Sequence, residues 1–152
     1  MKWIQISLLM VLVFPLWALG SNDKVITDWT SKVLKETLTV SYTQTLEEMN
    51  APSKYYSNNG WNSIANFLGT RIGNVKKYKL ITTPVADGSA QIVYSGVYKG
   101  LPFWRVNQAW KIPQANVEVW FSVVVMQKPD GNLQIDSVSM HGERTAPGFR
   151  ID

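Results

Sequence analysis

The stretch VEVWFSVVVMQKPDGNLQIDSVSM, residues 117–140, carries the clearest fold signal in the sequence. In its first half, the odd positions from Val117 to Val125 are all apolar. Successive side chains of a strand point to opposite faces of a sheet, so this pattern predicts a strand over Val117–Met126 with one face on a core. The even positions are mixed in polarity, and we expect the other face to be partly solvated or to meet a partner.

The second half of this stretch predicts a hairpin. Residues 128–132, KPDGN, form a strong turn signal, because proline presets the first turn position and glycine takes positive φ. Leu133–Met140 is then the return strand. Its apolar parity shifts between Ile135 and Val138, which predicts a β-bulge near Asp136–Ser137.

Upstream of this hairpin, the sequence has the composition of further strands. They are expected over Leu80–Val85, Gln91–Tyr98 and Phe103–Lys111, with turns at Asp87–Gly88–Ser89 and Gly100–Leu101–Pro102. Gly96 lies inside one of them and indicates either a bulge or the close approach of another chain segment. In the next strand, Trp104, Val106 and Trp110 share one face, which we expect to be apolar.

The first part of the chain has helical periodicity. A helix is predicted over Asp28–Met49 from an apolar stripe of Leu34, Leu38, Tyr42, Leu46 and Met49. Thr27 or Asp28 can cap its start, and residues 50–53, NAPS, end it because proline cannot continue a helix.

A second helix is predicted after Ser57–Asn58. Its apolar residues recur at helical spacing: Trp61, Ile64, Ala65 and Leu68. Gly69–Gly73 predicts a soft break, followed by a short third turn over Val75–Tyr78.

Helices followed by an antiparallel meander indicate an α+β domain. We expect N-terminal helices packed on one face of a curved sheet of four to five strands. The chain has 152 residues and no internal repeat or linker, which is typical of one domain.

The first twenty residues, MKWIQISLLMVLVFPLWALG, have the pattern of a secretory signal peptide. Lys2 supplies the positive start, Ile6–Phe14 is the apolar region, and small residues precede a cleavage site between Gly20 and Ser21. The alternative is an uncleaved membrane anchor with almost no cytoplasmic tail. Either way residues 21–141 are expected to fold outside the cytoplasm, and 142–152 to form a loose tail.

Composition excludes several kinds of site. The chain has no cysteine and a single histidine, so a thiolate metal site and a multi-histidine zinc site are both excluded within one chain. The formal charge of +4 is scattered, with no basic stripe or known module of a nucleic-acid-binding protein. We therefore expect no cofactor, no metal and no nucleic-acid partner.

Two groups of ionisable residues could carry a chemical function, and each also has an ordinary structural interpretation. His141 with Asp136 and Glu143 could act as a general acid–base group, but polar residues are ordinary at the end of a strand. A cone-shaped α+β domain can instead enclose an apolar pocket with one or two carboxylates, giving isomerase or small-ligand-binding activity. Asp136 and Glu118 are the candidates for such inward-pointing acids.

Several segments together resemble the IcmL/DotI-like family. Residues 38–43, LTVSYT, and 55–61, YYSNNGW, are similar to the family pattern "LTYSYTNY … YFTPxGW". Later matches follow in the same order: Gly96 and Gly100 before Phe103–Val106, the apolar strand Val117–Met126, and Pro129–Gly131 before the last strand. In this resemblance, Tyr42, Tyr56, Gly60 and Trp61 are the core signature residues. Pro102 and Asn107 depart from the family pattern.

The resemblance implies a fold and a role. The fold is the cone of the VirB assembly factors and of nuclear-transport-factor-like proteins. The role is that of a non-catalytic component, or accessory paralogue, of a type IVB secretion or conjugation apparatus in the periplasm. Its partners would be other envelope proteins of the apparatus and a homo-oligomer, with membrane contact only if the N-terminal segment is uncleaved. Aromatic residues are enriched at interfaces, so Trp104, Trp110 and Trp120 are candidates for the contact surface.

Overall fold

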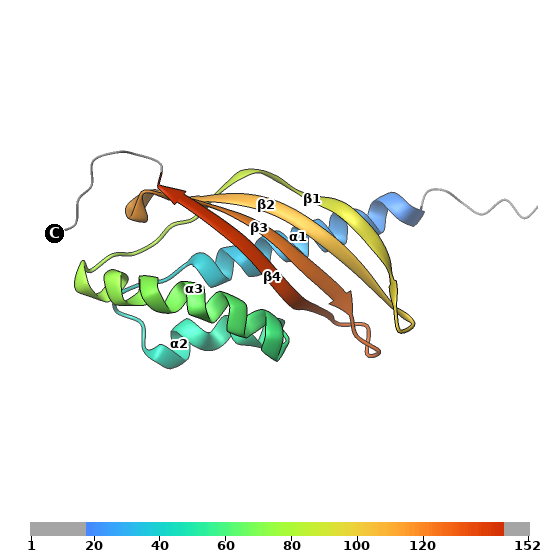
Figure 1. Ribbon diagram of the computed structural model, residues 1–152, viewed down its shortest axis with the longest axis horizontal. Coiled ribbons are helices and arrows are strands. Elements are labelled where there is room, and N and C mark those ends of the chain that lie inside the picture. Colours follow the sequence, from blue (N-terminus) through green and yellow to red (C-terminus); the bar gives the residue numbers. More distant parts are fainter. Residues whose placement is uncertain (1–17, 145–152) are drawn as a thin grey trace, which may run out of the picture.

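The structure of the protein, a computed structural model, describes the backbone of residues 18–144 and the side chains of residues 22–69 and 73–143 (Figure 1). Its elements are α1 (Ala18–Leu38), α2 (Leu46–Asn50), the 3₁₀ helix η1 (Ala51–Tyr55), α3 (Asn58–Lys77), β1 (Val85–Tyr98), β2 (Leu101–Ile112), the 3₁₀ helix η2 (Pro113–Ala115), β3 (Val117–Gln127) and β4 (Leu133–Arg144). The four strands form one antiparallel sheet in the order β1-β2-β3-β4. The α+β prediction is therefore confirmed.

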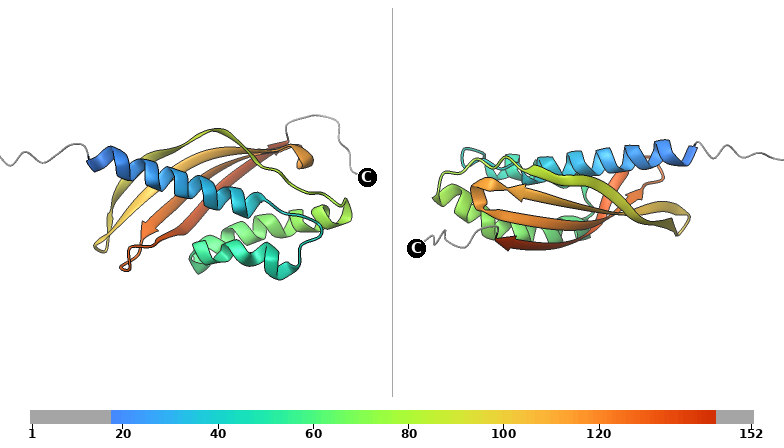
Figure 2. Two further views of the ribbon diagram at one scale, coloured as in Figure 1. Left: turned by 180° about the vertical axis from the view of Figure 1, so that it is seen from behind. Right: turned by 90° about the horizontal axis from the view of Figure 1, so that it is seen from above.

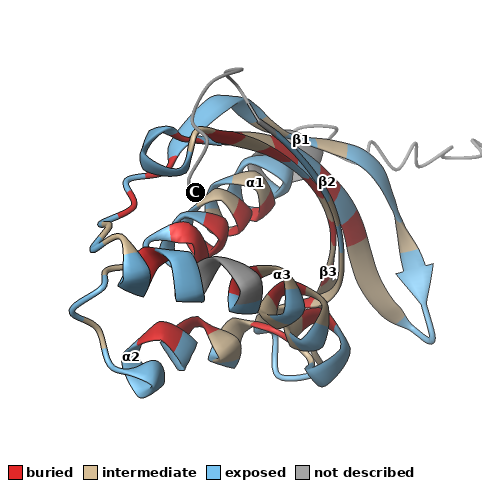
Figure 3. Ribbon diagram, turned by 60° about the vertical axis from the view of Figure 1, so that its left-hand side comes forward, coloured by how far each residue is buried: buried red, intermediate tan, exposed pale blue. Residues whose placement is uncertain are grey.

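The helices cover one face of the curved sheet and leave the other face open (Figures 1 and 2). Helix α1 packs against β1 and β2, while α3 packs along β4. The buried residues, red in Figure 3, lie where the helices and the sheet face each other. We call the helix-covered face of the sheet the inner face and the opposite one the outer face.

The β3–β4 hairpin forms as the sequence predicts. The odd positions from Val117 to Val125 are all buried on the inner face. The turn closes with the Lys128 amide donating to the carbonyl of Asn132 at 2.8 Å. Val124 pairs with Ser137 but Val125 pairs with Ile135, so the residue between them, Asp136, is an unpaired bulge.

Strand β1 differs from the prediction. The predicted strand over Leu80–Val85 is wrong, because Ile81 makes only an isolated bridge to Ser41 and β1 begins at Val85. The predicted turn at residues 87–89 is wrong as well: the strand continues through it, and the register shifts between Asp87 and Gln91. Gly88 takes a φ of 81°, which an edge strand absorbs as a bulge because it has a neighbour on one side only.

Gly96 allows a close approach and is not itself a bulge. It pairs with Phe103, and a Cβ placed on it would lie 3.1 Å from that ring. The turn that follows consists of Lys99 and Gly100, with φ values of 50° and 80°, so Leu101 and Pro102 already belong to β2. Two positive φ values match the type I′ turn that suits strand twist.

The predicted helix over Asp28–Met49 is two helices. Helix α1 ends at Leu38, because the following β-branched residues leave the helix and pair with residues 80–82. There the Tyr42 amide donates to the Leu80 carbonyl at 3.0 Å, and the Thr82 amide donates to the Val40 carbonyl at 2.8 Å. The sequence did contain a signal for the second helix: Thr45 and Glu48 form a capping box that begins α2.

Thr82 stabilises the extended segment that follows α1. It is buried, its Oγ accepts from the Val40 amide at 2.7 Å, and the same hydroxyl lies 2.7 Å from the Leu38 carbonyl. We expect Thr82→Val to lower the free energy of unfolding by about 1–3 kcal/mol, because it leaves buried backbone groups without partners. Urea denaturation measures the change. Thr83→Val, at an exposed neighbour, should change stability by less than about 0.5 kcal/mol, and equal effects would contradict the assignment.

Helix α3 does not break at Gly69–Gly73, and the predicted third turn is its continuation to Lys77. Both glycines are exposed and no packing strains them, so the helix tolerates them. The predicted start after Ser57 is confirmed, since the Ser57 hydroxyl accepts from the Gly60 amide at 3.1 Å as an N-cap.

The two ends of the chain bear on the predicted leader and tail. Helix α1 runs without interruption through Gly20 and Ser21, whereas residues 1–17 lie outside the described residues. Strand β4 extends to Arg144, so Gly142–Arg144 belong to the sheet and only residues 145–152 of the predicted tail lie outside. Within the described part of the chain, no helix is long and apolar enough to cross a membrane.

Candidate interaction surface

The start of α3 docks on the bulge of β4, and the signature residues 55–61 make this contact. The Ser57 amide donates to the Ile135 carbonyl at 2.8 Å. The Ser57 hydroxyl and the Asn59 side-chain amide both donate to the carbonyl of Asp136, at 2.9 and 3.1 Å. The bulge turns this carbonyl away from the ladder, and the helix start supplies its partners. The two predicted features therefore form one joint.

Gly60 lets the helix approach this closely. A Cβ at this position would lie 2.6 Å from the Ile135 carbonyl oxygen, well inside contact distance. Ser57 and Asn59 were not predicted from the sequence as contact residues. The available signal was an N-capping serine followed by two asparagines, whose side chains can donate hydrogen bonds. Gly60 thus has a packing role.

Tyr56 is the buried member of the signature. Its hydroxyl lies 2.8 Å from the Thr37 hydroxyl, which itself donates to the Val33 carbonyl, so Tyr56 donates to Thr37. Burial raises the pKa of Tyr56 above its ordinary value, and this phenol stays neutral. Its ring packs against Trp61, with centroids 5.5 Å apart.

Tyr42, by contrast, is exposed and is not a core residue. It was placed in the core as part of a long helical stripe. The chain leaves the helix before this position, and the stripe is lost at Tyr42 and Leu46.

The three candidate interface tryptophans fall on opposite faces of the sheet. Trp104 and Trp110 point to the inner face and are only 7% and 3% exposed, so their assignment to a contact surface is wrong. Even positions of β2 face the helices, whereas even positions of β3 face outward, because Trp110 pairs with Val119 and Ala109 with Trp120. Trp120 is accordingly 39% exposed on the outer face.

An open depression surrounds Trp120 on the outer face. It has a volume of about 420 Å³, and its lining combines apolar side chains such as Val93 and Met140 with amide and hydroxyl side chains such as Asn107 and Ser122. The Trp120 ring stacks on His141 of the neighbouring strand, with centroids 6.0 Å apart. An exposed aromatic ring among mixed apolar and polar side chains is typical of interfaces that must also tolerate water.

An ion pair and a histidine–carboxylate contact flank this depression. The Lys111 ammonium lies 3.0 Å from the Asp87 carboxylate, and the pairing lowers the pKa of Asp87 and raises that of Lys111. His141 lies 3.1 Å from Glu143. These pairs are exposed and contribute little to stability, but charged rims of this kind direct the choice of partner.

A further exposed apolar region lies on β1. Tyr94 packs against Phe103 with ring centroids 5.7 Å apart, in the space that Gly96 leaves. The exposed large apolar residues of this strand are Val85, Val93, Tyr94, Val97 and Tyr98. Sequence reasoning missed this surface, although apolar residues at both strand parities over 92–98 were a signal for it.

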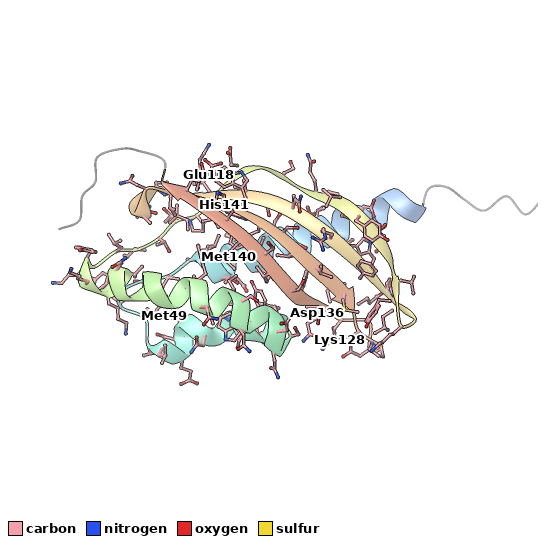
Figure 4. The ribbon with its side chains drawn as sticks, in the orientation of Figure 1. Met49, Glu118, Lys128, Asp136, Met140 and His141 are labelled. Carbon is pink, nitrogen blue, oxygen red and sulfur yellow. The ribbon has the colours of Figure 1, made fainter. Side chains whose placement is uncertain are left out.

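The acids proposed for a ligand-binding cone do not converge. Glu118 lies on the outer face near His141, while Asp136 lies toward the other end of β4 (Figure 4). Five residues of strand separate Asp136 from His141, which is roughly 16 Å. The buried polar side chains among residues 22–69 and 73–143 are Thr30, Thr37, Thr82 and Gln108, and none of these is a carboxylate. The same residues hold no cluster of three potential metal ligands.

Comparison with known proteins matches residues 8–113 to the family described as "Type-IV b secretion system, inner-membrane complex component". No curated protein sequence matches the chain. Among solved structures, the periplasmic domain of DotI is similar over 78% of this chain and 94% of its own, with 19% identity and a TM-score of 0.67.

Two further structures share the fold. A periplasmic fragment of TraM is similar over 81% of this chain and 98% of its own, with 19% identity and a TM-score of 0.66. An IcmL-like type IV secretion system protein from Legionella pneumophila covers 84% of this chain and 96% of its own, with 17% identity and a TM-score of 0.53.

Proposed function

The chain belongs to the DotI/IcmL family of type IVb secretion system inner-membrane complex components, and from this premise we propose that it is a non-catalytic part, or an accessory paralogue, of such an apparatus in the periplasm. It acts by binding other envelope proteins through the outer face of its sheet. A second copy of the chain is one candidate partner.

The periplasmic location is supported by two independent observations. The first twenty residues have the pattern of an export signal or a short anchor. The domain that follows shares its fold with the periplasmic domain of DotI and a periplasmic fragment of TraM. Both observations support a location of the folded domain outside the cytoplasm.

The non-catalytic role is supported by how the inner face is filled. Large apolar side chains of β2 and β3, including Trp104, Trp110 and Phe121, pack against α1 and α3 where a ligand-binding cone would have its cavity. Among the described residues, the acids that could serve a reaction lie on the outer face or at the bulge (Figure 4). The domain therefore offers surface for binding.

The observation that carries the proposal is the exposure of Trp120 on the face of the sheet that the helices leave uncovered. Exposed tryptophan side chains are enriched among binding hot spots. Here the ring lies among apolar and hydroxyl-bearing side chains with charged residues nearby, and an apolar centre with a polar rim is the usual anatomy of a protein interface.

We expect Trp120→Ala to weaken the capture of apparatus proteins, or self-association, by at least about tenfold, because a hot-spot aromatic contributes about 2 kcal/mol or more. Cross-linking in cells followed by affinity purification measures capture, and sedimentation measures self-association. Leu46→Ala is the control: it removes an exposed apolar side chain, 62% exposed against 39% for Trp120, from α2, on the side away from the sheet. Unchanged capture by the Trp120 variant, or equal losses in both variants, would contradict the proposed surface.

A further inference from the structure

The hairpin between β1 and β2 carries apolar side chains where a hairpin tip is normally polar. Val97 and Tyr98 are 70% and 56% exposed although they point to opposite faces of the sheet. Val93 and Tyr94, which precede the tip in β1, are also exposed. The packed helices do not reach this tip, so neither of its faces is buried by another part of the chain within residues 18–144 (Figures 1 and 2).

The tip lies at the same end of the molecule as the start of α1. Figure 1 and both views of Figure 2 show the blue first turn of α1 and the β1–β2 turn at one end of the long axis, while η2 lies at the other. The apolar run Ile6–Phe14 comes shortly before Ala18 in the sequence, so the chain enters the domain from this side.

The chemistry of the tip fits the boundary between lipid and water. The Lys99 ammonium lies 5.3 Å from the centre of the Tyr98 ring, so a cation, an amphipathic aromatic ring and an aliphatic side chain share the turn. Tyrosine and lysine of this kind concentrate at the headgroup level of membranes. Residues 88–117 contain no aspartate or glutamate. This segment therefore carries no negative side chain that anionic headgroups would repel.

We propose that the β1–β2 tip, residues 97–101, rests in the headgroup region of the membrane beside the N-terminal segment. This second contact fixes the tilt of the domain, so that the outer face around Trp120 is presented sideways to neighbouring proteins. The inference rests on the proposed envelope location and on an N-terminal segment that stays in the membrane, but it does not depend on which protein binds at Trp120.

The absence of cysteine from the chain makes the test direct, because a single introduced thiol can be labelled uniquely. The full chain is reconstituted into vesicles of phosphatidylethanolamine and phosphatidylglycerol with an environment-sensitive fluorophore on Val97→Cys. The control carries the label on Ala115→Cys, exposed in η2 at the opposite end. Nitroxide-labelled lipids then report the depth of each label.

At position 97 we expect a blue-shifted emission and strong quenching, greatest for nitroxides at headgroup depth, since interfacial side chains enter about 5–10 Å. At position 115 we expect neither. Water-exposed emission without quenching at both positions would overturn the inference, as would shielding of position 97 that occurs only when other apparatus proteins are added. Because capture through Trp120 is measured separately, each proposal can fail alone.

Discussion

Gly60→Ala is expected to lower the free energy of unfolding by about 2–4 kcal/mol, although it adds one methyl group to a helix, where alanine is intrinsically favoured. The new Cβ would lie 2.6 Å from the Ile135 carbonyl oxygen, which belongs to the backbone and cannot rotate away. The start of α3 would have to move off β4, and the bonds of Ser57 and Asn59 to the bulge would lengthen with it.

Gly69→Ala provides a matched control for this prediction. It lies in the same helix, and a Cβ there would have no atom within 4 Å. Alanine at an exposed helix position should raise stability by about 0.5–1 kcal/mol, so the two substitutions have opposite signs. Chemical denaturation of both variants decides the matter: a Gly60 variant as stable as the natural chain would show that α3 does not dock tightly on the bulge.

The second large effect is expected for Trp104→Ala, with a loss of about 3–5 kcal/mol. Its ring is 7% exposed and belongs to the main core cluster, so truncation leaves a cavity between β2 and the helices. Thermal or urea unfolding measures the loss, and the partly unfolded variant should also bind a dye for exposed apolar surface.

Trp120→Ala removes the same side chain from the neighbouring strand but from the outer face. We expect a change in stability of less than about 1 kcal/mol, because the ring is already partly solvated. This pair of variants separates folding from binding: Trp104 should affect the first and Trp120 the second. Similar losses of stability in both would contradict the assignment of the two faces.

The joint between α3 and β4 explains how local sequence features combine in this fold. The bulge at Asp136 and the serine cap at Ser57 were each predicted from their own neighbourhood. Their hydrogen bonds to one another connect positions 79 residues apart, and nothing in either local pattern indicates that distance. The bulge therefore serves as a docking point as well as an irregularity of the strand.

The signature residues and the proposed binding surface have different roles. Tyr56, Gly60 and Trp61 hold the helix layer to the sheet through burial and close contact. The surface around Trp120 lies on the opposite face and shares none of these residues. Variants of the signature are thus expected to act through stability, and variants of the outer face through partners.

The sequence by itself determined the parts of this protein whose causes are local. Alternation over 117–125 depends only on strand geometry, and the turn at 128–132 depends on proline and glycine backbone preferences. The same holds for the cap of α3 and for the parity shift that marks the bulge. In each case the residues that produce the structure are within a few positions of one another.

The tertiary structure alone decided the features that need a distant partner. The chain leaves its helix after Leu38 because Thr82, 42 residues beyond Val40, supplies the hydrogen bonds of an extended segment. Residues 87–89 stay in the sheet because β2 holds both sides of the bulge. Which tryptophan faces solvent depended on pairing across β2 and β3. Periodicity shows that a residue has a buried face, but only the packed neighbour determines which face that is.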